Sequence, residues 1–390
     1  MDARQDERHR ARAFRLDVLT ATSSAGLPPP WRVPLLMLGF IALFVGTGAG
    51  LARLGWTMPA LAVSAVPLHG PLMIGAFFGS VISLERAVAI GRGWAYLGPL
   101  LAGAGGMAAL FGAIGIGAAL LLAASVLLLA ASLDVWRRQR ALFTFTLVLG
   151  AACWAAGNAL WLAGGTVQDS VAWWLGFLIL TIAGERLELS RFLPPSPLAM
   201  RLFATLLFVI VGGLLLGTRS TWGVQVFAAG LLALAAWLIK QDIARRTVRG
   251  RGLTRFIAVC LLLGYAWLAI GSAVILAAGG LRPGTPAYDA ALHAIALGFV
   301  FSMVFGHAPI IFPAVLRVAV PYHPSFYAPL ALLHGSLALR LAGEALGQAD
   351  WLRVGALLNA LALAAFIVST ASAVLRGRRN SGPGRPGVSQ

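Results

Sequence analysis

Charged residues are scarce in this sequence, and their scarcity limits what the protein can be. They make up 11% of the 390 residues, whereas hydrophobic residues make up 59% and the mean hydropathy is +0.86. A water-soluble domain contains about 25% charged residues, so the composition excludes a soluble globular protein. Apolar runs of about 20 residues recur along the chain and predict a polytopic protein whose main contact is the lipid bilayer.

Cysteine and lysine are also rare. Cys153 and Cys260 both lie in apolar stretches, where a free cysteine behaves as a small hydrophobic residue. Two cysteines are too few for a zinc or iron–sulfur site built from thiolates alone. Lys240 is the sole lysine and all other basic residues are arginines, a bias that fits a GC-rich bacterial genome. We therefore expect the protein in a bacterial inner membrane.

Twelve apolar runs are long enough to cross a bilayer, so we predict an all-α membrane protein of about twelve transmembrane helices. The expected helices lie near 33–52, 60–84, 94–112, 115–133, 141–164, 171–190, 201–217, 222–240, 256–278, 287–316, 325–344 and 351–375. The net charge of +17 does not indicate binding to nucleic acid, because most arginines fall between these runs and there act as topology signals.

The arginines also predict the orientation. With the N-terminus inside, all but five of the 30 basic residues lie on the inner side, which is the distribution that the positive-inside rule requires. Both termini are then cytoplasmic. Residues 1–31 are expected to form a cytoplasmic tail, residues 32–375 the membrane domain, and residues 376–390 a disordered cytoplasmic tail rich in Gly, Arg, Ser and Pro.

Short sequence similarities suggest an internal repeat. Leu68-His69-Gly70 at the second predicted helix resembles Leu292-His293-Ala294 at the tenth, and Glu85-Arg86 resembles Glu185-Arg186 four helices later. Three four-helix units, each contributing its second helix to a common feature, would account for both. Coincidence in a sequence rich in Ala, Leu and Gly is the alternative.

The candidate functional residues are four histidines that fall inside predicted helices. They are His69, His293, His307 and His334. An ionisable side chain in a membrane is costly, usually faces the interior of the helix bundle, and is a functional-site hypothesis by default. The alternative for each is a neutral imidazole that forms a hydrogen bond between helices.

The heights of these histidines predict two pairs. His69 and His293 lie at similar distances from the outer ends of their helices, and His307 and His334 share a more cytoplasmic level. His293 and His307 are 14 residues apart, which in an α-helix places them near one face and about 21 Å apart. Two imidazoles from different helices at one height suit axial ligation of a haem iron. We therefore predict one or two haems, with copper as the alternative metal.

One arginine in a predicted helix is a further candidate. Arg340, with Arg53 or Arg282, would be placed to bind the propionates of a haem. The alternative is an ion pair along one helix, because Glu344 follows Arg340 by four residues.

The predicted protein has twelve helices, with a histidine on the second helix facing a histidine on the tenth. This arrangement resembles the catalytic subunit of haem–copper oxidases, and His69 and His293 carry the resemblance. The length, the number of helices and the segment from His293 to His307 also resemble the NnrS family of haem-containing membrane proteins associated with nitric oxide. The resemblance implies a membrane oxidoreductase that handles electrons or a diatomic gas with a redox partner. The sixth and seventh predicted helices contain no histidine, so oxygen reduction at a haem–copper centre is not expected.

A secondary transporter is the competing interpretation. In it the histidines line a cavity at the bilayer midplane and relay protons or a metal ion, while the segment from Pro309 to Pro313 is a broken helix beside the cavity.

Overall fold

The computed structural model describes residues 26–190, 195–217 and 220–380 of the chain. Of these described residues, 86% are helical and none forms a β-strand. Ten of the described helices are long and apolar enough to cross a membrane. The predicted fold class, an all-α polytopic membrane protein, is confirmed.

Twelve long helical segments occupy the positions of the twelve predicted ones. They are α2 (Pro29–Arg53), the π-helix η2 with α4 (Pro71–Phe78, Gly79–Ile90), α5 (Leu97–Leu110), α6 (Ile114–Arg138), α7 (Leu142–Leu162), α8 (Val167–Leu189), α9 (Pro197–Leu215), α10 (Thr221–Gln241), α12 (Gly252–Ala278), α13 with the π-helix η5 and α14 (Pro286–His293, Ala294–Phe301, Ser302–Leu316), α15 (Tyr327–Leu346) and α16 (Ala349–Asn380). Short helices α3 (Ala60–Ser64) and α11 (Ala244–Thr247) lie between them.

Two of the twelve segments, α5 and α15, are not among the ten candidate membrane spans. Helix α5 has 14 residues, which reach only about 21 Å at 1.5 Å per residue, so it is shorter than the hydrocarbon core. Helix α15 is longer but includes His334, Arg340 and Glu344. Both pack among the other helices, α5 against α6 and α15 against α16.

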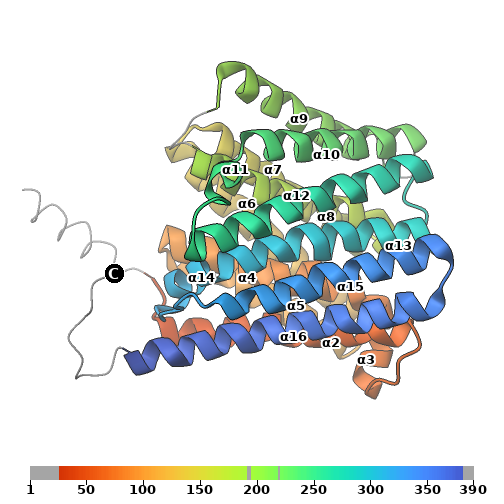
Figure 1. Cartoon of the computed structure of the whole chain (residues 1–390), viewed down its shortest axis with the longest axis horizontal. Coiled ribbons are helices and arrows are strands. Elements are labelled where there is room, and N and C mark those ends of the chain that lie inside the picture. The colour runs from red at the N-terminus through yellow and green to blue at the C-terminus, as the bar shows by residue number, and fades with distance from the viewer. Residues whose placement is uncertain (1–25, 191–194, 218–219, 381–390) are drawn as a thin grey trace, which may run out of the picture.

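The long helices run roughly parallel to one another, and neighbours in the sequence pack side by side (Figure 1). Helix α8 is the most completely buried of the candidate spans, and it contacts both π-helices, η2 and η5. The first and last parts of the chain meet where α2 packs against α14 and α16. Large apolar side chains such as Phe208 and Leu215 are exposed, as expected of a surface that contacts lipid.

Two eight-residue π-helices are the unusual feature of the backbone. His69 lies two residues before η2, and His293 directly precedes η5. A π-helix has i→i+5 hydrogen bonds and often occurs at functional sites. The prediction that His293 and His307 lie near one helix face assumed an uninterrupted α-helix. Because η5 lies between them, that prediction does not apply.

Helix α14 continues through Pro309 and Pro313 to Leu316, so the segment expected to be broken is helical. At the C-terminus, α16 extends past Leu375 to Asn380, which places the first residues of the predicted C-terminal tail in this helix. The N-terminal tail up to residue 25 and the C-terminal tail from residue 381 lie outside the described residues.

Candidate functional site

A cavity of about 760 Å³ lies between the first and last parts of the chain. Its walls come from α2, η2, α8, α13, η5, α15 and α16. One end includes the exposed loop residues Pro283 and Gly284, whereas Leu175, Leu297 and Leu363 contribute an apolar wall. This volume is within the range of about 300–1,000 Å³ that small-molecule and cofactor sites occupy.

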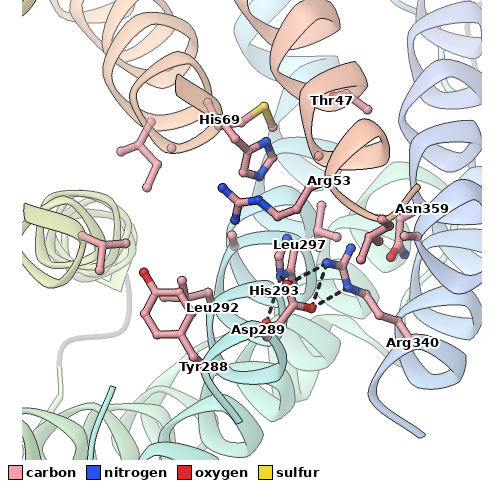
Figure 2. A pocket seen from close by; sticks show the side chains of 18 of the residues that line it. Thr47, Arg53, His69, Tyr288, Asp289, Leu292, His293, Leu297, Arg340 and Asn359 are labelled. Carbon is pink, nitrogen blue, oxygen red and sulfur yellow. Dashed lines mark hydrogen bonds and ion pairs between the residues drawn. The ribbon is translucent and has the colours of Figure 1, made fainter. Parts of the chain in front are cut away.

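His69 and His293 face each other in this cavity. Figure 2 shows the two imidazoles approaching the same space from different helices, with Arg53 beside His69. Their ring centres are 6.2 Å apart and the ring planes differ by 26°. When two imidazoles ligate one metal atom from opposite sides, their ring centres lie about 6 Å apart, because each metal–nitrogen bond is about 2 Å long and each centre lies about 1 Å behind its nitrogen. The observed separation fits a bridging metal.

Hydrogen bonds determine which nitrogen of each ring is available. The Nδ1 atom of His69 lies 2.7 Å from the carbonyl oxygen of Gly46 on α2, and Nδ1 of His293 lies 2.8 Å from that of Asp289. A carbonyl can only accept, so both Nδ1 atoms carry a proton, and the neutral form of each ring has its lone pair on Nε2. Neither Nε2 atom has a hydrogen-bond partner among the described residues. A histidine whose other nitrogen donates to a carbonyl or carboxylate is the usual form of a metal ligand.

Arg340 lies beside this pair but is bound to an acid. Its Nε and Nη2 atoms donate to the carboxylate of Asp289 at 2.8–3.0 Å. Arg340 therefore forms its ion pair with Asp289 and not with Glu344, although Glu344 also lines the cavity. Arg53, in contrast, lines the cavity and donates only to the carbonyl of Val66, at 3.2 Å, among the described residues. Arg282 is exposed and is not part of the cavity wall.

Two glycines on α2 provide space for side chains of the cavity wall, Gly50 for His69 and Gly46 for Met73. A Cβ atom on Gly50 would lie 3.0 Å from Cε1 of His69, and one on Gly46 would lie 2.9 Å from Sδ of Met73. Both belong to the Gly46-Thr47-Gly48-Ala49-Gly50 segment, whose small residues are the sequence signal for this close approach. Two other glycines on the helical segment of His293 and His307 pack against α12: Gly298 contacts Trp267, and Gly306 contacts Cys260.

His334 is held by two hydrogen bonds and belongs to helix packing. Trp267 Nε1 donates to its Nδ1 at 2.8 Å, so Nε2 carries the proton and donates to Ser302 Oγ at 3.2 Å. Ser302 in turn donates to the carbonyl of Gly298. Neither nitrogen of His334 is free for a metal.

Replacing His334 by leucine should therefore reduce stability and leave the cavity intact. The change leaves Trp267 Nε1 without an acceptor, while Ser302 keeps its bond to Gly298, and a buried polar group without a partner costs about 1–3 kcal/mol. Thermal unfolding in detergent should occur at a lower temperature than in the wild type. Any cofactor bound between His69 and His293 should stay at the wild-type amount, and its loss from a folded variant would contradict the separation of the two sites.

His307 belongs to a buried ionic network near the other end of the bundle. Arg186 makes two hydrogen bonds to Asp242, at 2.8 and 3.0 Å, and its Nη1 atom lies 3.5 Å from Nε2 of His307. Tyr265 donates to the same carboxylate at 2.6 Å, and His307 Nδ1 lies 2.7 Å from the carbonyl of Met303. These residues tie α8, α12 and α14 to the end of α10.

The structure does not bring His307 and His334 together. His334 contacts Ser302, which precedes His307 by five residues on α14 and therefore lies about 7.5 Å away along the helix axis. They have no hydrogen-bond partner in common, because His307 contacts Arg186 and Met303 whereas His334 contacts Trp267 and Ser302. Among the residues that the structure describes, no group of three or more His, Cys, Asp and Glu side chains is placed to hold a metal ion. A two-ligand site between His69 and His293 remains compatible with this.

The comparison with protein families identifies one match. A family described as a domain of unknown function (DUF8744) matches residues 32–375, the same range as the predicted membrane domain. The chain belongs to this family. No curated protein and no solved structure matches it.

Proposed function

We propose that the protein holds one haem between His69 and His293 and transfers electrons through it. The observation that carries the proposal is the pair of facing imidazoles, 6.2 Å apart, whose Nδ1 atoms are both bound to carbonyls. Bound there, the haem iron would supply a one-electron couple whose potential depends on its ligands and surroundings. Since both nitrogens of His334 have partners, the proposal is limited to one haem.

The surroundings of the pair support haem rather than a bare metal. A porphyrin is flat, apolar and edged by two carboxylates, and this cavity combines an apolar wall with Arg53 at its exposed end. We assign the propionate-binding role expected of Arg340 to Arg53, because Arg340 already binds Asp289. Copper is the alternative metal, with Met73 near His69 on the cavity wall as a third ligand.

Electron transfer is favoured over gas binding. With both imidazoles holding a haem iron, no ligand position would be left open for nitric oxide or another diatomic gas. A redox partner on either side of the membrane would then be required. We further propose a bacterial inner membrane location with both termini cytoplasmic, supported by the distribution of arginines along the sequence.

An absorption spectrum of the purified protein tests the proposal. After expression with sufficient haem, the detergent-solubilised protein should show a Soret band and the sharp visible bands of a reduced bis-histidine haem, at one haem per chain. Metal analysis should find iron and no stoichiometric copper or zinc. A colourless protein with one copper ion per chain would contradict the haem proposal and support the copper site.

A secondary transporter is the second candidate, and one observation favours it. The cavity reaches exposed residues at one end, whereas the Arg186–Asp242 pair is buried in the bundle toward the other, an arrangement expected of a transporter open to one side. The prolines expected to break the helix beside the cavity lie in continuous α14 and do not line the cavity. Uptake of copper or zinc into liposomes by colourless protein would favour this candidate.

A further inference from the structure

The two facing histidines have different hydrogen-bond partners. Nδ1 of His69 contacts one neutral acceptor, the carbonyl of Gly46. Nδ1 of His293 contacts two acceptors of one residue, the carbonyl oxygen of Asp289 at 2.8 Å and its Oδ1 atom at 3.2 Å. His307 has a carbonyl partner as His69 does. Within the described part of the chain, His293 is thus the intramembrane histidine whose ring contacts a carboxylate.

Asp289 is held in this position from a different helix. Arg340 makes three hydrogen bonds to its two carboxylate oxygens, and the Arg340 side chain is only 8% exposed. Arg340 is fixed in turn by close packing of α15 on α16, because a Cβ atom on Gly355 would lie 2.7 Å from the backbone nitrogen of Arg340. Figure 2 shows this chain of contacts from Arg340 through Asp289 to His293.

This arrangement has a known chemical effect on a metal ligand. A carboxylate that accepts the Nδ1 proton of a histidine orients the ring and makes its Nε2 atom a stronger donor to a metal. A carbonyl oxygen carries no charge and does this less. The parallel hydrogen bonds from the guanidinium limit the rotation of the carboxylate.

We propose that Asp289, held by Arg340, is a positioning residue that makes His293 the more strongly electron-donating of the two histidines and so lowers the reduction potential of a metal bound between them. This inference rests on the proposed function, since it concerns the haem site. It adds a difference in electron-donating strength between the two histidines, which the distance between their rings does not require.

The test compares Asp289→Asn with a matched control, Glu344→Gln. Each substitution removes one carboxylate from the wall of the same cavity. The Asp289 carboxylate lies 3.2 Å from Nδ1 of His293, whereas Glu344 interacts with Asp289 and not with the His293 ring. In haem-loaded protein, Asp289→Asn should raise the reduction potential, change the low-spin electron paramagnetic resonance signal and weaken haem retention by roughly 10–100-fold. Glu344→Gln should give a smaller rise in potential with an unchanged resonance signal.

Arg340→Lys provides a second variant, which remains informative where Asp289→Asn does not fold. Lysine keeps the positive charge but cannot make the two parallel hydrogen bonds of a guanidinium. The variant should broaden the low-spin signal and raise the potential, because Asp289 is then less firmly held.

The possible outcomes separate this inference from the proposed function. Wild-type protein without haem would overturn the proposed function before any variant is compared. Wild-type protein with bis-histidine haem, together with equal shifts for Asp289→Asn and Glu344→Gln and an unchanged resonance signal, would overturn the positioning role of Asp289 alone. Wild-type behaviour of Arg340→Lys would overturn the contribution of Arg340.

Discussion

Replacing either His69 or His293 by alanine is expected to yield a protein that inserts into the membrane and contains no bound haem. Each substitution removes one of the two facing imidazoles, and the remaining histidine would provide a single ligand. The structural cost should be small by comparison, because each ring makes hydrogen bonds worth about 1 kcal/mol in net stability. Absorption spectra and haem assays on the purified variants measure the effect.

The matched control is His323→Ala. His323 is exposed, lies between α14 and α15, and contacts Ser325 rather than the cavity, so this variant should retain haem at the wild-type amount. Adding imidazole to a His69→Gly protein should restore part of the bound haem. Stoichiometric low-spin haem in both alanine variants would exclude this pair as the axial ligands.

Breaking the Arg186–Asp242 pair should destabilise the protein more than any other single change to an ion pair described above. Both side chains are buried, and removal of one partner from a buried pair leaves an uncompensated charge at a cost of about 3–5 kcal/mol. Arg186→Met leaves the carboxylate of Asp242 with its bond to Tyr265 but without a cation. Thermal unfolding and the yield of inserted protein should both decrease.

Two control variants test whether the loss of stability in Arg186→Met comes from the uncompensated buried charge. Arg138→Ala removes an exposed ion pair with Asp134 on α6, so it should change stability by less than about 1 kcal/mol. The double variant Arg186→Met with Asp242→Leu should recover stability relative to Arg186→Met, because no lone charge is left in the bundle. A double variant less stable than Arg186→Met would show that the network contributes through its hydrogen bonds rather than through charge compensation.

The helices were predictable from the sequence because hydrophobic runs of sufficient length determine them directly. The meeting of His69 and His293 was also within reach, since their heights on two helices follow from counting residues. The partner of Arg340 was not predictable. Glu344 is four residues away on the same helix and Asp289 is 51 residues away in sequence, so only the packing of α13 against α15 selects the second.

The π-helices and the ionic network around Arg186 were likewise not predictable from the sequence. An apolar run such as Pro71–Phe78 has the same composition in an α-helix and in a π-helix, so hydrophobic periodicity does not distinguish them. Arg186 turns into the bundle because Asp242 at the end of α10 offers a carboxylate there. The two residues are 56 positions apart, so the sequence alone does not pair them.

The π-helices also determine how the histidines are related to the rest of their helices. A turn closed by i→i+5 bonds contains one residue more than an α-helical turn. Side chains after each π-helix are therefore rotated about the helix axis relative to their positions in an uninterrupted α-helix. The rings of Phe77 and Phe301, near the ends of η2 and η5, stack with centres 6.0 Å apart. Each π-helix therefore changes the direction in which the following side chains point, so that its helix carries an imidazole at one level and an aromatic contact at another.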